Sequence, residues 1–112
     1  MFESEKFQQA LEMFTKAIEL CGSNPEFYCN RSDVHMKMEN HLLSIEDCQK
    51  ALDLDPDYSK AYNLIGEAQS MLMKFKEAVN MHTAAIEIDG FNPKFYLRHN
   101  IFQLELTYFP LF

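Results

Sequence analysis

Residues 25–58, PEFYCNRSDVHMKMENHLLSIEDCQKALDLDPDY, set the pattern of the whole chain, because their spacing recurs on both sides at intervals of 34 residues. Tyr28 corresponds in this register to Tyr62 and Tyr96. The small and apolar positions of the second half of the unit recur as Ala17, Ala51 and Ala85, and as Ile18, Leu52 and Ile86. A period of this length is typical of a repeat made of two helices. The sequence therefore predicts an all-α solenoid.

Composition limits the classes of function. The 112 residues, 47% of them hydrophobic, suffice for one small domain. A formal net charge of −7 argues against binding to nucleic acid, which needs clustered Lys and Arg. The three cysteines, Cys21, Cys29 and Cys48, cannot all pair within the chain, which favours a reduced, intracellular setting, cytoplasmic or nuclear. No apolar run approaches the ~18 residues of a membrane-spanning helix.

The register divides the chain into one domain of four parts. Residues 1–22 form a partial repeat, 23–58 and 59–92 form full repeats, and 93–112 form a capping helix with an apolar tail. About six helices are expected. Asn24 before Pro25 predicts a helix N-cap, and Asp57 is the predicted cap of the helix that starts at residue 59.

The first helix, predicted over residues 4–20, corresponds to the second helix of a unit whose first helix would precede Met1. Two interpretations stay open: the gene product starts here, or the sequence is a fragment of a longer chain. The stripe formed by Phe7, Leu11 and Phe14 would lack its usual partner. Exposed apolar surface of this kind predicts self-association.

The sequence predicts no enzyme, no cofactor and no metal site. The histidines lack the spacing of zinc ligands, and His35 and His82 are expected to be packed inside the helix pairs. Cys48 and His82 share one repeat position, but no third catalytic residue accompanies them. Gly66 is predicted to mark a close crossing of two helices.

Seven methionines raise the question of an adaptable binding surface. Met36, Met38, Met71 and Met73 fall at corresponding ends of two first helices. We expect them to fill gaps at the turns, with a binding role for Met36 and Met71 as the alternative.

The concave face of such a solenoid is lined by the first helix of each pair, and this face is the candidate binding surface. The predicted peptide-binding residues are Asn30, Lys60, Asn63, Leu64, Lys94 and Arg98. Cations and amides in an otherwise acidic protein suit a carboxylate ligand. The alternative is an ordinary solvated helix face.

Three stretches, EKFQQALEMFTKAIEL, FYCNRSDVHMK and DCQKALDLDPDYSKAYNLIGEA, carry a family resemblance. The chain resembles tetratricopeptide-repeat co-chaperones, most closely the small glutamine-rich tetratricopeptide family. The resemblance implies a right-handed superhelix of antiparallel helix pairs. It also implies binding to the acidic C-terminal tails of Hsp70 and Hsp90 through a clamp that holds two carboxylates.

The residues of that clamp are matched in part. Asn30 fits the Asn of the third helix, and Lys60 fits the Lys of the last pair, but Leu64 stands where the family has Arg. The helix that bears the family's first Lys and Asn would precede Met1. The resemblance therefore implies a protein-interaction module for chaperone tails, with an incomplete clamp. The alternative is a scaffold that associates through its apolar helix ends.

Overall fold

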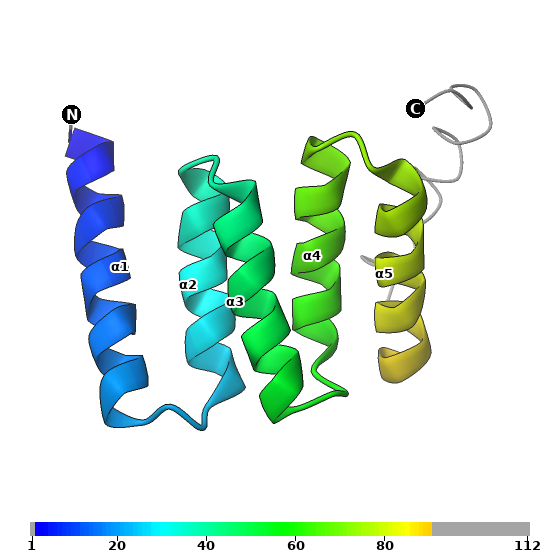
Figure 1. Cartoon of the computed structure of the whole chain (residues 1–112), viewed down its shortest axis with the longest axis horizontal. Coiled ribbons are helices and arrows are strands. Elements are labelled where there is room, and N and C mark those ends of the chain that lie inside the picture. The colour runs from blue at the N-terminus through cyan, green and yellow to red at the C-terminus, as the bar shows by residue number, and fades with distance from the viewer. Residues whose placement is uncertain (1, 91–112) are drawn as a thin grey trace.

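The computed structural model describes residues 2–90, with side chains from Ser4 onward. Figure 1 shows α1 (Phe2–Leu20), α2 (Pro25–Lys37), α3 (His41–Leu54), α4 (Ser59–Met71) and α5 (Phe75–Asp89). The predicted all-α solenoid is confirmed. The sixth helix and apolar tail, predicted for residues 93–112, lie outside the described residues. None of the described helices has the length and apolar character needed to cross a membrane.

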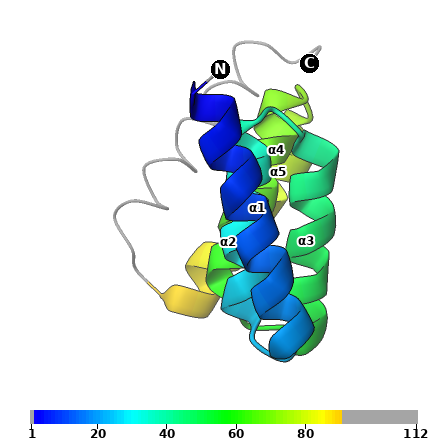
Figure 2. The same cartoon turned by 90° about the vertical axis from the view of Figure 1, so that its left-hand side faces the viewer.

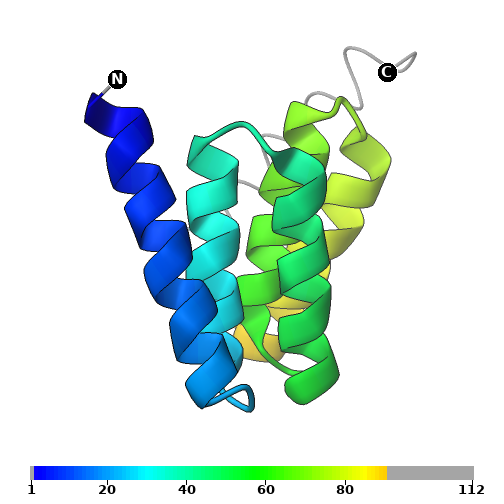
Figure 3. The ribbon, with the colours of Figure 1, turned by 60° about the vertical axis from the view of Figure 1, so that its left-hand side comes forward.

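Each helix packs against the next one in the chain, and α2 also contacts α4. Seen along the row of helices, α2 and α3 lie on opposite sides of α1 (Figure 2). Figure 3 shows the same row obliquely, with α2 and α3 running antiparallel beyond α1. The contact between α2 and α4 places the first helices of the two complete units side by side, as a solenoid requires.

The helix starts confirm one predicted cap and correct another. Asn24 caps α2, since its side-chain oxygen accepts a hydrogen bond from the Glu26 backbone N–H at 3.0 Å. Asp57 does not cap α4. The N-cap residue is Tyr58, which makes no side-chain cap bond, because α4 starts at Ser59 and Asp57 lies one position too early. The backbone N–H of Asp57 instead donates to the Asp55 carboxylate at 3.1 Å.

The two tight turns share an unusual backbone conformation. Glu39, between α2 and α3, has φ 62°, and Met73, between α4 and α5, has φ 65°. These residues are one repeat period apart, and both occupy the left-handed region that favours Gly or Asn. The turn geometry is therefore repeated although the residue types differ.

Between α2 and α3 the core contains small polar groups. The Ser32 hydroxyl donates to the Ser44 carbonyl at 2.9 Å and lies 2.7 Å from the Ser44 hydroxyl. It also lies 3.0 Å from the sulfur of Cys48. Around this network is a buried cluster formed by Cys29, Cys48, Ala51, Ala61, Leu64 and Ile65.

The corresponding positions of the next unit hold a different pair. Gly66 and His82 stand one period after Ser32 and Cys48, and both are buried. A Cβ on Gly66 would lie only 2.6 Å from Nε2 of His82. The glycine therefore makes room for a side chain, the imidazole, and not for the close approach of two helix backbones that was predicted. Cys48 and His82 each face the first helix of their own unit, so the structure gives no support to a Cys–His pair.

Gly66→Ala should lower the free energy of unfolding by about 1–3 kcal/mol, because the buried imidazole of His82 leaves no space for a methyl group. The cost of this clash should exceed the gain from the better helix propensity of Ala. Gly66→Ser combined with His82→Cys reproduces the Ser32–Cys48 pair and should recover most of that loss. Urea unfolding of Gly66→Ser, of His82→Cys and of the double variant measures the coupling between the two positions. Strictly additive effects would show that the two positions do not share one space.

Candidate functional site

The face shared by α2 and α4 brings together two of the predicted binding residues. The Lys60 ammonium, on exposed α4 surface, donates to the Asn30 side-chain oxygen on α2 at 3.4 Å. This bond is long and solvent-exposed, so a stronger acceptor can replace it at little cost. The pair is thus positioned to present one cation and one amide to a ligand.

Two other predicted residues are less accessible than expected. Asn63 is 7% exposed and Leu64 is 6% exposed. Leu64 belongs to the buried cluster with Ala61 and Ile65, so the expectation of a side chain open to the groove is wrong. An apolar side chain one turn after Lys60 gains more from packing inward than from facing water. Whether Asn63 and Leu64 contact a peptide stays a prediction.

The last two predicted residues, Lys94 and Arg98, lie outside the described part of the chain. Their place on the concave face stays a prediction. The site that the structure describes therefore consists of Asn30 and Lys60, with Asn63 nearly buried beside them on α4.

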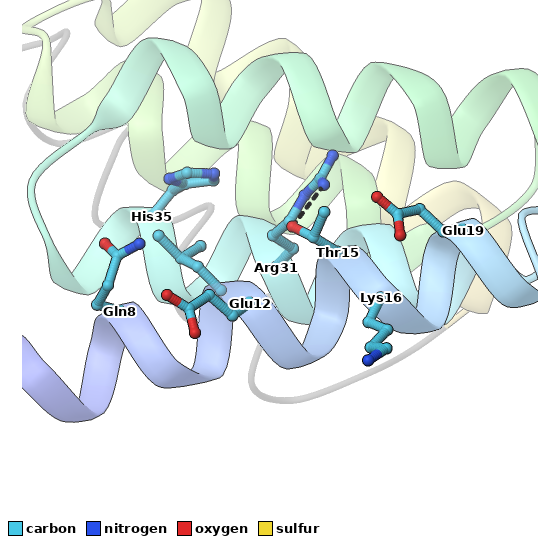
Figure 4. A pocket seen from close by; sticks show the side chains of 8 residues that line it. Gln8, Glu12, Thr15, Lys16, Glu19, Arg31 and His35 are labelled. Atoms are coloured by element: carbon cyan, nitrogen blue, oxygen red, sulfur yellow. Dashed lines mark hydrogen bonds between the residues drawn. The ribbon is translucent and has the colours of Figure 1, made fainter.

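A second concave surface, which the sequence did not reveal, lies on α1 and α2. It encloses about 500 Å³ and is lined by Gln8, Leu11, Glu12, Thr15, Lys16, Glu19, Arg31 and His35 (Figure 4). Charges of both signs border it. A groove of such mixed polarity favours no single ligand. The interactions made by the Arg31 and His35 side chains that line it are described next.

Arg31 forms the centre of those interactions. Its guanidinium donates two hydrogen bonds to the Asp47 carboxylate, at 2.8 and 2.7 Å, and one to the Thr15 hydroxyl at 3.1 Å. Asp47 is only 3% exposed. The hydrogen bond with Asp47 raises the pKa of Arg31, which keeps the guanidinium charged. One side chain of α2 thereby joins α1 to α3.

His35 lies next to this ion pair, with Nε2 3.7 Å from the Asp47 carboxylate. Burial lowers the pKa of His35; Asp47 raises it, and Arg31 lowers it. Because burial and Arg31 together prevail, the neutral imidazole is favoured in the folded chain.

Two tetratricopeptide-repeat family models match the chain, at residues 25–58 and 48–80. The chain is 32% identical over 93 residues to the pea protein "Translocon at the outer membrane of chloroplasts 64". It is 30% identical over 89 residues to "Small glutamine-rich tetratricopeptide repeat-containing protein 2" of Mycosarcoma maydis. These matches cover 83% and 80% of the chain, but only 16% and 25% of the relatives.

Solved structures give the same result for the fold. The second TPR domain of human RPAP3, determined in complex with the HSP70 peptide SGPTIEEVD, matches with a TM-score of 0.80 and 26% identity, over 91% of this chain and 85% of that chain. The second TPR of Spaghetti (RPAP3), bound to the HSP90 peptide SRMEEVD, matches with a TM-score of 0.70 and 30% identity, over 78% and 81%.

Asp47→Asn should lower the free energy of unfolding by about 3 kcal/mol, because it leaves the Arg31 cation partly buried without its counter-ion. Glu46→Gln is the matched control. Glu46 is exposed and, within the described part of the chain, forms an ion pair with Lys50 at 4.0 Å, so its loss should cost about 0–1 kcal/mol. Urea unfolding compares the two variants, and equal losses would contradict a special role for the buried pair.

Stability should also fall on mild acidification. The unfolded chain takes up a proton on His35 near pH 6.5, whereas the folded chain does so only at lower pH. Stability contributed by the neutral ring is therefore complete above that pH and declines as the pH falls below it. His35→Gln should flatten this part of the profile of unfolding free energy against pH. An unchanged slope would assign the acid sensitivity to other groups.

Proposed function

We propose that this chain, which belongs to the tetratricopeptide-repeat family, binds the free acidic C-terminus of an Hsp70- or Hsp90-type chaperone along α2 and α4. The observation that carries the proposal is the meeting of Lys60 and Asn30 on that face at 3.4 Å. The similar RPAP3 domains that were solved with HSP70 and HSP90 peptides support it.

The chemistry begins with the replacement of a weak acceptor. A peptide carboxylate would accept from the Lys60 ammonium in place of the Asn30 side-chain oxygen. With its side-chain amide flipped, Asn30 would donate an N–H to the same carboxylate. Charge-assisted bonds to a carboxylate contribute about 1.5–3 kcal/mol each, more than the long, exposed bond to a neutral amide oxygen that they replace.

The clamp is incomplete within the described residues. Leu64 supplies no cation at the position where the family has Arg, and its buried place leaves no room for a simple exchange. An Arg there would remove apolar contacts and would have to extend its guanidinium to the surface. We infer that this domain binds chaperone tails more weakly than a complete clamp does, and that Lys94 and Arg98 contribute the remaining cations.

The peptide SGPTIEEVD with a free C-terminus should bind measurably in calorimetric titration, and its C-terminal amide should bind at least about tenfold more weakly, a difference of ~1.4 kcal/mol. Lys60→Ala and Asn30→Ala should reduce affinity for the free acid to a similar degree. Lys50→Ala is the control, because this exposed lysine lies on α3, away from the shared face.

The dependence of affinity on salt tests the electrostatic contribution of Lys60 to binding. The affinity of the wild type should fall with ionic strength, and that of Lys60→Ala should fall less, since one exposed cation has been removed. Equal binding of the acid and the amide, or equal loss with Lys50→Ala, would reject carboxylate recognition at this face.

A further inference from the structure

Two thiols meet in the core of the first complete unit. Cys29 on α2 and Cys48 on α3 are both fully buried and belong to the same cluster. A hydrogen bond joins their side chains. Cys29 precedes Ser32 by three positions on α2, so both face the same side, and the Ser32 hydroxyl lies 3.0 Å from the Cys48 sulfur. Two cysteines from different helices are thus in contact, away from the candidate binding face.

The two helices can approach each other closely at this point. The facing residues Ser32, Ser44 and Ala51 are small and fully buried. Helices with small side chains at their contact pack at the short end of the usual ~8–10 Å between axes. A disulfide needs Cα atoms roughly 5.5–6 Å apart, and at most about 7 Å. Facing cysteines at such a contact come within this range after a small backbone shift.

The two thiols differ in acidity. The hydrogen bond with Cys29 lowers the pKa of Cys48, burial raises it, and the Ser32 hydroxyl lowers it further. The same thiol–thiol bond, together with burial, raises the pKa of Cys29. A thiolate reacts with oxidants, whereas a thiol does not react readily. Cys48 is therefore the sulfur that reacts first, and Cys29 keeps its proton for a second step.

We propose that Cys29 and Cys48 form a reversible disulfide between α2 and α3 when the folded chain is exposed to hydrogen peroxide. Both sulfurs are closed off from solvent, which favours an oxidant little larger than water. A slight local opening of the α2–α3 pair is enough to admit such a molecule. The proposal does not depend on the binding of chaperone tails.

The reaction consumes one peroxide molecule for two thiols. The Cys48 thiolate attacks one peroxide oxygen, so an S–O bond forms, the O–O bond breaks and hydroxide leaves. This hydroxide and the proton given up by Cys48 make the first water, and the sulfur, oxidised by two electrons, is a sulfenic acid. The Cys29 sulfur then attacks the Cys48 sulfur. The S–S bond forms, the S–O bond breaks, and the leaving hydroxyl takes the Cys29 proton to make the second water.

The test uses the full chain with Cys21→Ser, because Cys21 is exposed and would otherwise pair between chains. The folded, reduced protein is treated with hydrogen peroxide, and the free thiols are then counted in denaturant. We expect their number to fall from two to none, and dithiothreitol to restore both. The oxidised chain should melt about 10 °C higher, because the bond restricts the unfolded chain.

Peroxide also reaches methionines on the surface. Met71 and Met73 are 62% and 59% exposed, so the prediction that they fill gaps at the turns is wrong. Their oxidation adds mass to the chain, and the disulfide is therefore assigned by thiol counting and peptide mapping instead of by the intact mass. The two methionines also serve as an internal check that the oxidant is active.

Variants of the two thiols test the order of the steps. Added to Cys21→Ser, Cys29→Ala should leave a sulfenic acid on Cys48, which dimedone captures. Cys48→Ala should leave Cys29 unlabelled. This difference would not arise if the cysteines only filled space in the core. Equal labelling of the two variants would overturn the proposal.

Two further results would also overturn it. The first is a folded chain whose two core thiols stay free after Met71 and Met73 have been oxidised. The second is a rate of disulfide formation that rises with urea in proportion to the unfolded fraction, because the pairing would then belong to the unfolded chain. We expect the rate to change much less steeply than that fraction, since only the α2–α3 pair has to open.

Discussion

The packing of residues that face each other across a helical hairpin is the constraint on which this structure depends. Ser32 meets Cys48 in one unit, and Gly66 meets His82 in the next. In each case the second residue comes sixteen positions after the first. This distance is set by the length of one helix, a tight turn and the way back along the partner helix. The helices can approach closely only if the two side chains together fill one fixed space.

The same spacing places the polar and charged residues that connect three helices. Thr15, Arg31 and Asp47 follow one another at intervals of sixteen, and the guanidinium of Arg31 reaches the other two. While this network holds α2 between α1 and α3, another side of α2 faces α4. That is where Asn30 meets Lys60. The buried ion pair thus positions the candidate binding face without taking part in it.

Sequence periodicity predicted the helices and their order well, because a 34-residue repeat with recurring Ala and Tyr positions determines which sides of the helices are buried. It predicted the Asn24 cap, whose side chain and neighbouring proline form a local signal. It misplaced the cap at Asp57 by one residue, since α4 starts at Ser59 and the residue directly before it is Tyr58. It treated Leu64 as open because family register gives the side of a helix but not the depth of burial. The Arg31–Asp47 pair was missed since its partners lie on different helices, although the regular interval between them was a usable signal.

The complementary volumes of Ser32 with Cys48 and of Gly66 with His82 have a consequence for how such a chain changes over generations. A larger residue at either member of a pair is acceptable only after its partner has become smaller, so the two positions must change in a fixed order. A serine introduced at position 66 alone would meet the His82 imidazole, so one residue of a pair cannot be exchanged between the two complete units without the other. Neighbouring units can therefore differ at these positions only as matched pairs.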